Sequence, residues 1–494
     1  MSTMFSARRF VLCLGALLAV APGAVGSPAA EAPEPCRVTV RPERVLRSID
    51  RKLYGVNALF WIDDDAVRAD GRVTKRLREL PCGFMRFPGG TVADNYHWKT
   101  QRLDDPSLYP KTEGPQTTDT DEFIAWCREV GAEPLMVVNA QSGVIAGDLE
   151  AGLREAAEWV DYCNRQRGYR VRYWEIGNEI FLNCPRRPMT AQEYASLLSR
   201  FSQAMKRVDP AIQIGAIGPP QAKHIVLMDR LPGGERQRLL VMPLKAREEE
   251  MKRLATRTPK DRGDAWWPTL IRQAGRDFDF ATVHIYPWGG TFDKFAAKPL
   301  AFAGDMAEIK QLFAQELPDR RIPLAITEWN LGRQRQTRGI GSALILAELQ
   351  GNWLYGGVDM ANFWSTRFPS QAFPMLLDYE THEPQPPYQV LQLFASKLGS
   401  ELLACNSSSS QIYAAAGCEG KRLNLILLNK SAQSRPQEVG IALGKDATHA
   451  VATCLSADKP DAGHFRVSQP HMERKAEIWK CTLPPYSLTH VGFE

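Results

Sequence analysis

Short apolar runs alternate with helical patterns along most of the chain. Eight runs are typical of strands because they are brief, rich in β-branched and aromatic residues, and bounded by polar or turn residues. Between them, apolar residues recur at helical spacing, as in TDEFIAWCREVGAE and in TAQEYASLLSRFSQAMKRVDP, where Thr190 is placed to cap the helix. The eight runs are LYGVNALFW (53–61), GFMRFPGG (83–90), PLMVVNA (134–140), VRYWEIGNE (171–179), IQIGAIGPP (212–220), FATVHIYPW (280–288), IPLAITEWN (322–330) and DMANFWSTR (359–367).

This strand-helix alternation predicts a parallel sheet covered by helices. Eight units within residues 53–385 fit a closed (β/α)8 barrel, the TIM-barrel fold. A doubly wound open sheet is the alternative, but no Gly-x-Gly-x-x-Gly turn follows the first strand. We therefore expect an α/β protein whose largest domain is a barrel.

After the proline-rich segment HEPQPPYQVLQLFASKLG, the pattern changes to short alternating strands. NLILLNK, QEVGIALG, HAVATCLSA and AEIWKCTLPPYSLTHVGF are separated by polar turns, which predicts an antiparallel β-sandwich over 386–494. The segment 27–52 contains CRVTVRPERV, which also alternates, and we expect it to join the sandwich.

One insertion, residues 221–265, follows the fifth strand and carries REEEMKRLATRTPKDRGD. Glu248 and Lys252 have the spacing of an ion pair along a helix. The run is typical of a solvated helix; a role in shaping a cleft is the alternative.

The amino terminus resembles a secretory signal peptide. Arg8 and Arg9 precede the apolar run FVLCLGALLAV, and small residues follow it, which predicts cleavage near Gly26 and a secreted or periplasmic protein. A membrane anchor is the alternative, but the run is shorter than the ~20 residues that a spanning helix needs. We expect residues 1–26 to be a signal peptide.

Charge and cysteine content narrow the possibilities further. The formal net charge is +5, and removing the two arginines of the leader brings it to +3, so nothing indicates a nucleic-acid partner. No Cys-x-x-Cys pair or local Cys/His cluster indicates a zinc site. In an oxidising compartment we expect the bridges Cys405–Cys418 and Cys454–Cys481.

Glu179 and Glu328 come at the ends of the fourth and seventh predicted strands. Barrel enzymes build their sites at the carboxyl ends of the strands, so the two carboxylates should converge on one cleft. Glycosidases need such a pair, one to protonate the departing oxygen and one to stabilise or attack the sugar carbon. The pair predicts glycosidase chemistry, without a metal or a cofactor.

Further side chains at strand ends extend this constellation. An arginine favours the charged form of a nearby carboxylate, Asn178 could hold a sugar hydroxyl, and a tryptophan offers an apolar face to a sugar ring. Structural roles are the alternatives: an ordinary barrel ion pair for the arginine, a satisfied structural histidine, and core packing for Trp364. The predicted substrate-binding residues are Arg86, Asn178, His284, Tyr286, Trp329 and Trp364, with Asn330 beside them.

At these residues the sequence resembles the retaining glycoside hydrolases of the large (β/α)8 clan, most closely the family 51 α-L-arabinofuranosidases. RFPGGTVADNYHW, TDEFIAWCREVGAEPLMVVN, YWEIGNE, VHIYPW and ITEWN occur in that family's order, and LPPYSLTHVGF resembles its last sandwich strand. The resemblance implies that Glu179 is the general acid/base and Glu328 the nucleophile, with Asn178 contacting the sugar and Tyr286 supporting the nucleophile.

The sequence departs from the family at Thr91, where Asn usually follows the paired glycines and helps to bind the furanose. We expect a carbohydrate substrate, with α-L-arabinofuranosidase activity the first hypothesis. A β-xylosidase, an endoglucanase or a uronic-acid glycosidase of the same clan is the second. A sugar-binding protein on an inactive barrel is the third, and the presence of both carboxylates disfavours it. A metal-dependent hydrolase is disfavoured because His284 has no His or Asp nearby at ligand spacing.

Overall fold

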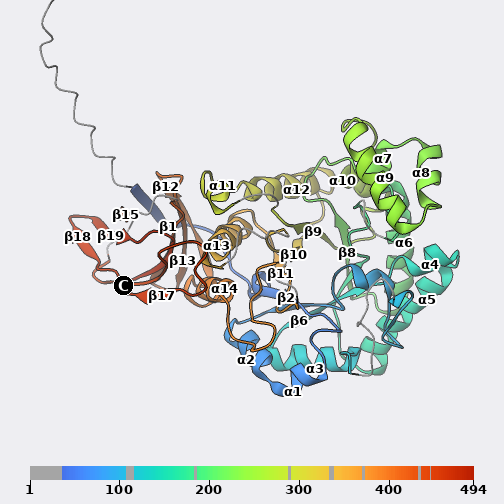
Figure 1. The fold of residues 1–494 in the computed structure, drawn as a ribbon, viewed down its shortest axis with the longest axis horizontal. Coiled ribbons are helices and arrows are strands. Elements are labelled where there is room, and N and C mark those ends of the chain that lie inside the picture. Colours follow the sequence, from blue (N-terminus) through green and yellow to red (C-terminus); the bar gives the residue numbers. More distant parts are fainter. Residues whose placement is uncertain are drawn as a thin grey trace, which may run out of the picture. The chain divides into compact units, whose positions relative to one another are not determined.

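The computed structural model describes residues 36–106, 116–182, 186–287, 291–332, 339–369, 373–431, 436–444 and 447–494 (Figure 1). The predicted signal peptide, residues 1–26, lies outside this range. Among the residues that the structure describes, no helix is long and apolar enough to cross a membrane.

Eight strands form a closed barrel in which every neighbouring pair is parallel, which confirms the predicted fold class. Each strand lies inside one of the predicted apolar runs, except that β6 begins one residue before its run. The strands are β2 (Gly55–Asn57), β3 (Phe84–Phe87), β6 (Glu133–Val138), β7 (Tyr173–Ile176), β8 (Gln213–Gly218), β9 (Phe280–Ile285), β10 (Leu324–Trp329) and β11 (Met360–Phe363).

Helices follow the barrel strands along the chain. Capping boxes begin two of them, Asp119 with Glu122 at α3 and the predicted Thr190 with Glu193 at α6. The helices are α1 (Asp65–Asp70), α2 (Arg72–Glu79), α3 (Thr120–Val130), α4 (Ser142–Ala146), α5 (Leu149–Val160), α6 (Ala191–Val208), α10 (Trp266–Ala274), α11 (Phe292–Ala296), α12 (Phe302–Glu316), α13 (Gly339–Tyr355) and α14 (Pro386–Lys397).

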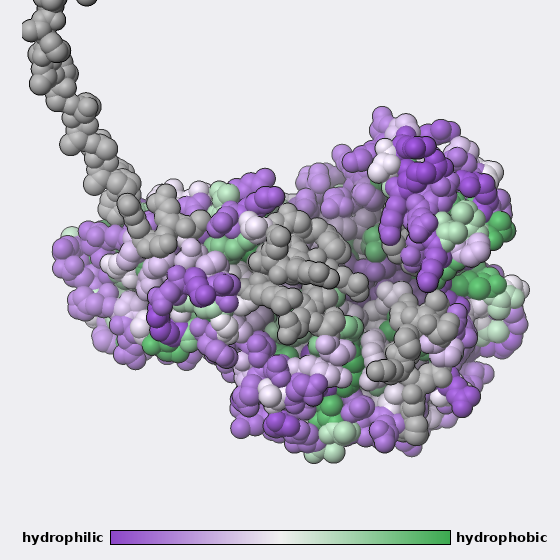
Figure 2. All heavy atoms as spheres, viewed as in Figure 1, coloured by the Kyte–Doolittle hydropathy of each residue, from purple (hydrophilic) through white to green (hydrophobic). Residues whose placement is uncertain are grey.

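The insertion after β8 forms three more helices, α7 (Leu227–Arg230), α8 (Gly233–Leu240) and α9 (Leu244–Arg257). Figure 2 shows them mostly hydrophilic on the face in view, as expected of solvated helices. The ion pairs of α9 nevertheless differ from the prediction: Glu250 pairs with Arg253 and Arg238, each at 2.5 Å, whereas no pair joins Glu248 to Lys252 among the described residues.

The carboxy-terminal strands form a second, mostly antiparallel sheet of ten strands, in the order β17-β16-β20-β14-β13-β12-β1-β15-β19-β18. The amino-terminal strand β1 (Cys36–Ser48) lies inside this sheet, antiparallel to β12 and parallel to β15. The others are β12 (Glu401–Ser407), β13 (Ile412–Glu419), β14 (Arg422–Asn429), β15 (Gln437–Leu443), β16 (Ala450–Ser456), β17 (Arg466–Ser468), β18 (Glu473–Lys475), β19 (Ile478–Leu483) and β20 (Ser487–Phe493). The sheet encloses its own apolar core, which includes Val38, Leu425 and Val491.

The two predicted disulfides are wrong in this structure, where none of the four cysteines forms a disulfide. Cys418 lies opposite Glu401 in the β12–β13 register, which puts Cys405 four residues further along β12. At ~3.3 Å per residue this offset is far beyond the reach of a disulfide. Cys454 on β16 and Cys481 on β19 are both buried, and no disulfide joins them.

Candidate active site

Glu179 lies in a tight turn just beyond β7, and not at the end of the strand as predicted. The strand ends at Ile176, and both Gly177 (φ 75°) and Glu179 (φ 49°) have left-handed backbone conformations. Such a conformation is unfavourable for a residue with a side chain and persists only where surrounding contacts impose it. A side chain at position 177 would be strained by this positive φ, and its Cβ would lie 2.3 Å from Cδ1 of Ile180.

Glu328 extends inward from β10 and is buried. Its Oε1 accepts a hydrogen bond from Arg86 Nη1 at 2.8 Å, and its Oε2 accepts one from the Tyr286 hydroxyl at 2.8 Å. Burial raises the pKa of Glu328 above the ordinary value; His284 and Arg86 oppose this rise, and Glu179 adds to it.

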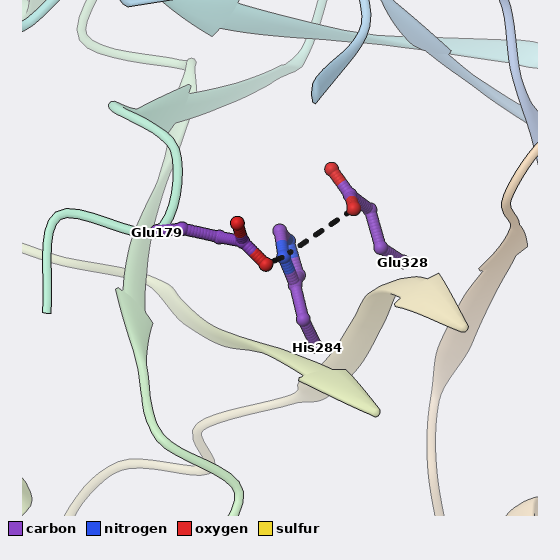
Figure 3. Close-up of side chains that lie close together, drawn as sticks. All are labelled: Glu179, His284 and Glu328. Atoms are coloured by element: carbon purple, nitrogen blue, oxygen red, sulfur yellow. Dashed lines mark hydrogen bonds and ion pairs between the residues drawn. The ribbon is translucent and has the colours of Figure 1, made fainter. Parts of the chain in front are cut away.

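His284 lies between the two glutamates, as Figure 3 shows. Its Nδ1 is 2.9 Å from Glu179 Oε1 and 3.6 Å from Glu328 Oε2. Burial alone would lower the pKa of His284, but the charges of Glu328 and Glu179 outweigh burial and raise it. Tyr286 is also buried, and burial followed by the charge of Glu328 raises its pKa well above the ordinary value.

The facing atoms of Glu179, His284 and Glu328 all lie within 4.8 Å of one another, the one grouping of His, Cys and carboxylate side chains in the described residues compact enough to surround a cation. Hydrogen bonds with His284, Arg86 and Tyr286 already account for how these carboxylates are held, and we assign no metal to them.

Arg86, from β3, links four side chains and is 0% exposed. Besides Glu328, it donates to Glu175 Oε2 at 2.6 Å, to Asn178 Oδ1 at 2.8 Å and to Asn57 Oδ1 at 3.0 Å. Burial would lower the pKa of Arg86, but Glu175 and Glu328 raise it above the ordinary value.

Sequence reasoning missed Glu175 and Asn57. Their signal was a polar residue inside an apolar barrel strand, at a position whose alternation faces the barrel interior. Sequence reasoning also missed Asp94, in the 3-10 turn η2 (Gly90–Asn95), whose carboxylate accepts the backbone N–H of Asn178 at 3.0 Å. Burial raises the pKa of Asp94 to about 7, although hydrogen bonds from the Asn178 and Ala140 backbones oppose the rise.

The two predicted tryptophans lie in different surroundings. Trp329 is 1% exposed and packs on Trp353 and Phe363, with ring centroids 5.7 and 5.1 Å away. This buried packing does not support the predicted sugar contact of Trp329, which stays a prediction. Trp364 follows β11 and is half-buried, with its ring over Gly90, where a Cβ would lie 2.5 Å away. Asn330 donates to the Pro374 carbonyl at 2.7 Å and holds the loop after β11.

A closed parallel barrel with two facing carboxylates at the carboxyl ends of its strands, joined to a curled antiparallel sheet, has the architecture of a TIM-barrel glycoside hydrolase. Residues 76–255 match the family model described as the Alpha-L-arabinofuranosidase 1 domain. This match confirms the resemblance indicated by the motifs; it includes Glu179, whereas Glu328 lies beyond it.

Curated relatives and solved structures agree with this match. Alpha-L-arabinofuranosidase C of Emericella nidulans is 32% identical over 189 residues, covering 33% of this chain and 36% of the relative. The intracellular exo-alpha-(1->5)-L-arabinofuranosidase of Acetivibrio thermocellus is 27% identical over 221 residues, covering 37% of this chain and 41% of the relative. The chain thus spans little more than a third of the length of the curated relatives it matches.

The fold similarity extends over nearly the whole chain. The alpha-L-arabinofuranosidase of Thermotoga maritima, solved as an arabinose complex, has a TM-score of 0.69 at 19% identity, covering 92% of this chain and 99% of that one. A family 44 xyloglucanase of Paenibacillus polymyxa has a TM-score of 0.63 at 15% identity, covering 93% and 99%. Both sequence identities are low, so these structures establish the shared fold and do not identify the substrate.

Proposed function

We propose that the chain is a retaining glycoside hydrolase in which Glu328 is the nucleophile and Glu179 the general acid/base. The carrying observation is the approach of their carboxylate oxygens within 4.8 Å. Retaining enzymes hold the two carboxyl groups ~5–5.5 Å apart, whereas inverting enzymes need ~6.5–9.5 Å to admit a water molecule.

In the first step, an oxygen of Glu328 forms a bond to the anomeric carbon of the sugar. The bond from that carbon to the leaving oxygen breaks, and the oxygen takes the proton of Glu179. Arg86 and Tyr286 donate hydrogen bonds to Glu328 and aim it. In the second step, Glu179 removes a proton from water, the water oxygen bonds to the anomeric carbon, and the ester to Glu328 breaks.

The surroundings of the two carboxylates support these proposed roles. The side chain of Glu179 is 22% exposed and can exchange a proton with the cleft, whereas that of Glu328 is only 6% exposed and held by two donors. Asn178 has a buried Nδ2 without a hydrogen-bond partner, which supplies a donor for a sugar hydroxyl. Trp364 offers an aromatic face beside the paired glycines.

An α-L-arabinofuranoside is the substrate we propose first, because the matching family model and curated relatives carry that activity in their names. A glucan or xylan backbone is the second candidate, because a bifunctional glucanase-xylanase has the same fold with a TM-score of 0.65. The fold alone does not separate the two.

A panel of nitrophenyl glycosides tests both proposals: arabinofuranoside, xyloside, glucoside and glucuronide. We expect the arabinofuranoside to be cleaved fastest, and proton NMR to show a first product with the anomeric configuration of the substrate. Cleavage of the xyloside or glucoside alone would refute the arabinofuranoside as the substrate and favour the second candidate. An inverted first product would refute the retaining mechanism.

We further propose export from the cytoplasm, on the signal-like pattern of residues 1–26. Expression of the full chain in a bacterial host tests this: a mature protein that begins near residue 27 outside the cytoplasm supports export. An intact amino terminus inside the cytoplasm argues against it.

A further inference from the structure

Glu175 is a buried carboxylate that the proposed reaction does not use. Its side chain on β7 is 0% exposed, so a substrate in the cleft does not touch it. Both of its oxygens are occupied, Oε2 by Arg86 Nε at 2.6 Å and Oε1 by the Thr327 hydroxyl at 2.9 Å. A buried charge is expensive to desolvate, so its position behind the site requires an explanation.

The geometry of Arg86 supplies part of that explanation. A guanidinium is planar, with its donors in a fixed fork, so a bond at Nε determines where the other two nitrogens point. With Nε on Glu175, Nη1 meets Glu328 at 2.8 Å and Nη2 meets Asn178 at 2.8 Å. Glu175 therefore sets how Arg86 meets the proposed nucleophile.

The positive charge of Arg86 supplies the other part of the explanation for the buried Glu175. In a buried site, an unbalanced guanidinium strongly favours the ionised form of a neighbouring carboxylate. Stabilising that ground-state carboxylate more than the transition state, in which its charge is being consumed, slows the reaction. Glu175 balances Arg86, so the guanidinium can orient Glu328 with little net charge.

We propose that Glu175 is a positioning residue that orients Arg86 and cancels its charge, so that Glu328 is aimed without being over-stabilised. This inference rests on the proposed glycosidase function. The groups that face Glu328 are Arg86 on β3, Glu179 after β7, and His284 and Tyr286 on and after β9. Among the described residues, Arg86 is the charged group that hydrogen-bonds both Glu175 and Glu328.

Glu175→Gln tests the charge while keeping the shape. The amide oxygen can still accept from Arg86, and the amide nitrogen can donate to the Thr327 oxygen. With the best substrate of the panel, we expect the acidic limb of the kcat/KM profile to move to lower pH by ~0.5 units or more, because an unbalanced Arg86 favours ionised Glu328. We also expect the rate of glycosyl-enzyme formation to fall about tenfold at the pH optimum.

Thr327→Val is the matched control, because it removes a neutral hydrogen bond from the same carboxylate and leaves the charge. It should keep the acidic limb of the wild type. Glu175→Asp keeps the charge but withdraws it from Arg86, so the limb should stay in place while glycosylation slows about fivefold or more through lost orientation.

A Glu175→Gln enzyme with the limb and glycosylation rate of the wild type would overturn the inference. So would an activity loss that only follows the melting temperature while the limb stays in place. If Glu175→Gln does not fold, Glu175→Asp decides the question, and a wild-type glycosylation rate in that variant overturns the inference. Failure of the wild-type enzyme to cleave any glycoside would instead refute the proposed function.

Discussion

Glu328 and Glu179 carry the same chemical group, but their different surroundings support different proposed roles. Glu328 accepts hydrogen bonds from Arg86 and Tyr286, whereas Glu179 lies in a turn and its side chain is 22% exposed. A nucleophile is needed with every substrate, so we expect Glu328→Gln to reduce turnover of all glycosides at least ~10⁴-fold. Steady-state rates on the panel check this, with the circular dichroism spectrum as the control for folding. Residual activity of a tenth of wild type would place the nucleophile elsewhere.

Glu179→Ala should affect substrates unequally, because an acid matters only as far as the leaving group needs a proton. Poor leaving groups should react about 10²- to 10⁴-fold more slowly. An activated phenol should still form the covalent intermediate, and azide should speed its breakdown to a glycosyl azide with retained configuration. Azide rescue of the Glu328 variant with inverted product, and no effect on Glu179→Ala, would exchange the two roles.

The pH dependence follows from the raised pKa of Glu328. The nucleophile must be ionised, so activity is lost as pH falls through its pKa. Because burial raises this pKa, the acidic limb of kcat/KM should lie above the ~4.3 of an ordinary glutamate. A pH-rate profile checks this, and a limb at or below the ordinary value would contradict the assigned environment.

The sequence predicted the residues of the candidate site where they belong to a motif. Glu179, Glu328, Arg86, His284 and Tyr286 were predicted to face one cleft, and the structure brings them together. Trp329 packs on Trp353 and Phe363 in the structure, and no motif in the sequence indicated this packing. The pairing of Arg86 with Glu175 depends on distances across the barrel, and no local sequence pattern contains these distances.

At the scale of elements, the turn after β7 is the unit that presents the acid/base. Asp94 holds this turn from outside by accepting the Asn178 N–H, while its carboxylate also accepts Gln141 Nε2 at 3.2 Å. Barrel strands were predictable because each is a continuous apolar run. Strands β12 and β13 were not predicted, because ELLACNS and IYAAAGCE mix small and polar residues without strict alternation.

Asp94→Asn should loosen this turn, because one carboxylate oxygen accepts the Ala140 N–H and the other accepts the Asn178 N–H, so the amide NH2 would face one of these donors. We expect kcat/KM to fall about 10- to 100-fold through misplacement of Glu179, since small displacements of catalytic groups are costly. Asp148→Asn is the matched control, the same change at the cap of α5. Equal activities of the two variants would show that Asp94 does not position the turn.

At the scale of the whole molecule, a buried ion pair connects a helix of the barrel to the carboxy-terminal sheet. Lys430, just after β14, lies 2.8 Å from Glu348 on α13, and their side chains are 4% and 2% exposed. The strand order of the carboxy-terminal sheet, with β1 between β12 and β15, was beyond sequence reasoning, because pairing between distant segments leaves no local signature. The expectation that the amino-terminal segment joins this sheet rests on its alternation and on its position before the first barrel strand.

Lys430→Ala should destabilise the protein by ~3–5 kcal/mol, because it leaves Glu348 buried without its cationic partner. Arg466→Ala is the control: it breaks the exposed pair with Asp458, which should be worth at most ~1 kcal/mol. Urea denaturation followed by fluorescence measures both. Equal shifts in the two midpoints would contradict a structural role for the buried pair.

The central claim is that Glu328 forms a covalent bond to the sugar. The most direct measurement is to mix the Glu179→Ala variant with an activated dinitrophenyl arabinofuranoside, quench it, and map the adduct by peptide mass spectrometry. We predict one pentosyl group attached to Glu328. An adduct on any other residue, or efficient turnover with an inverted product and no adduct, would contradict the account.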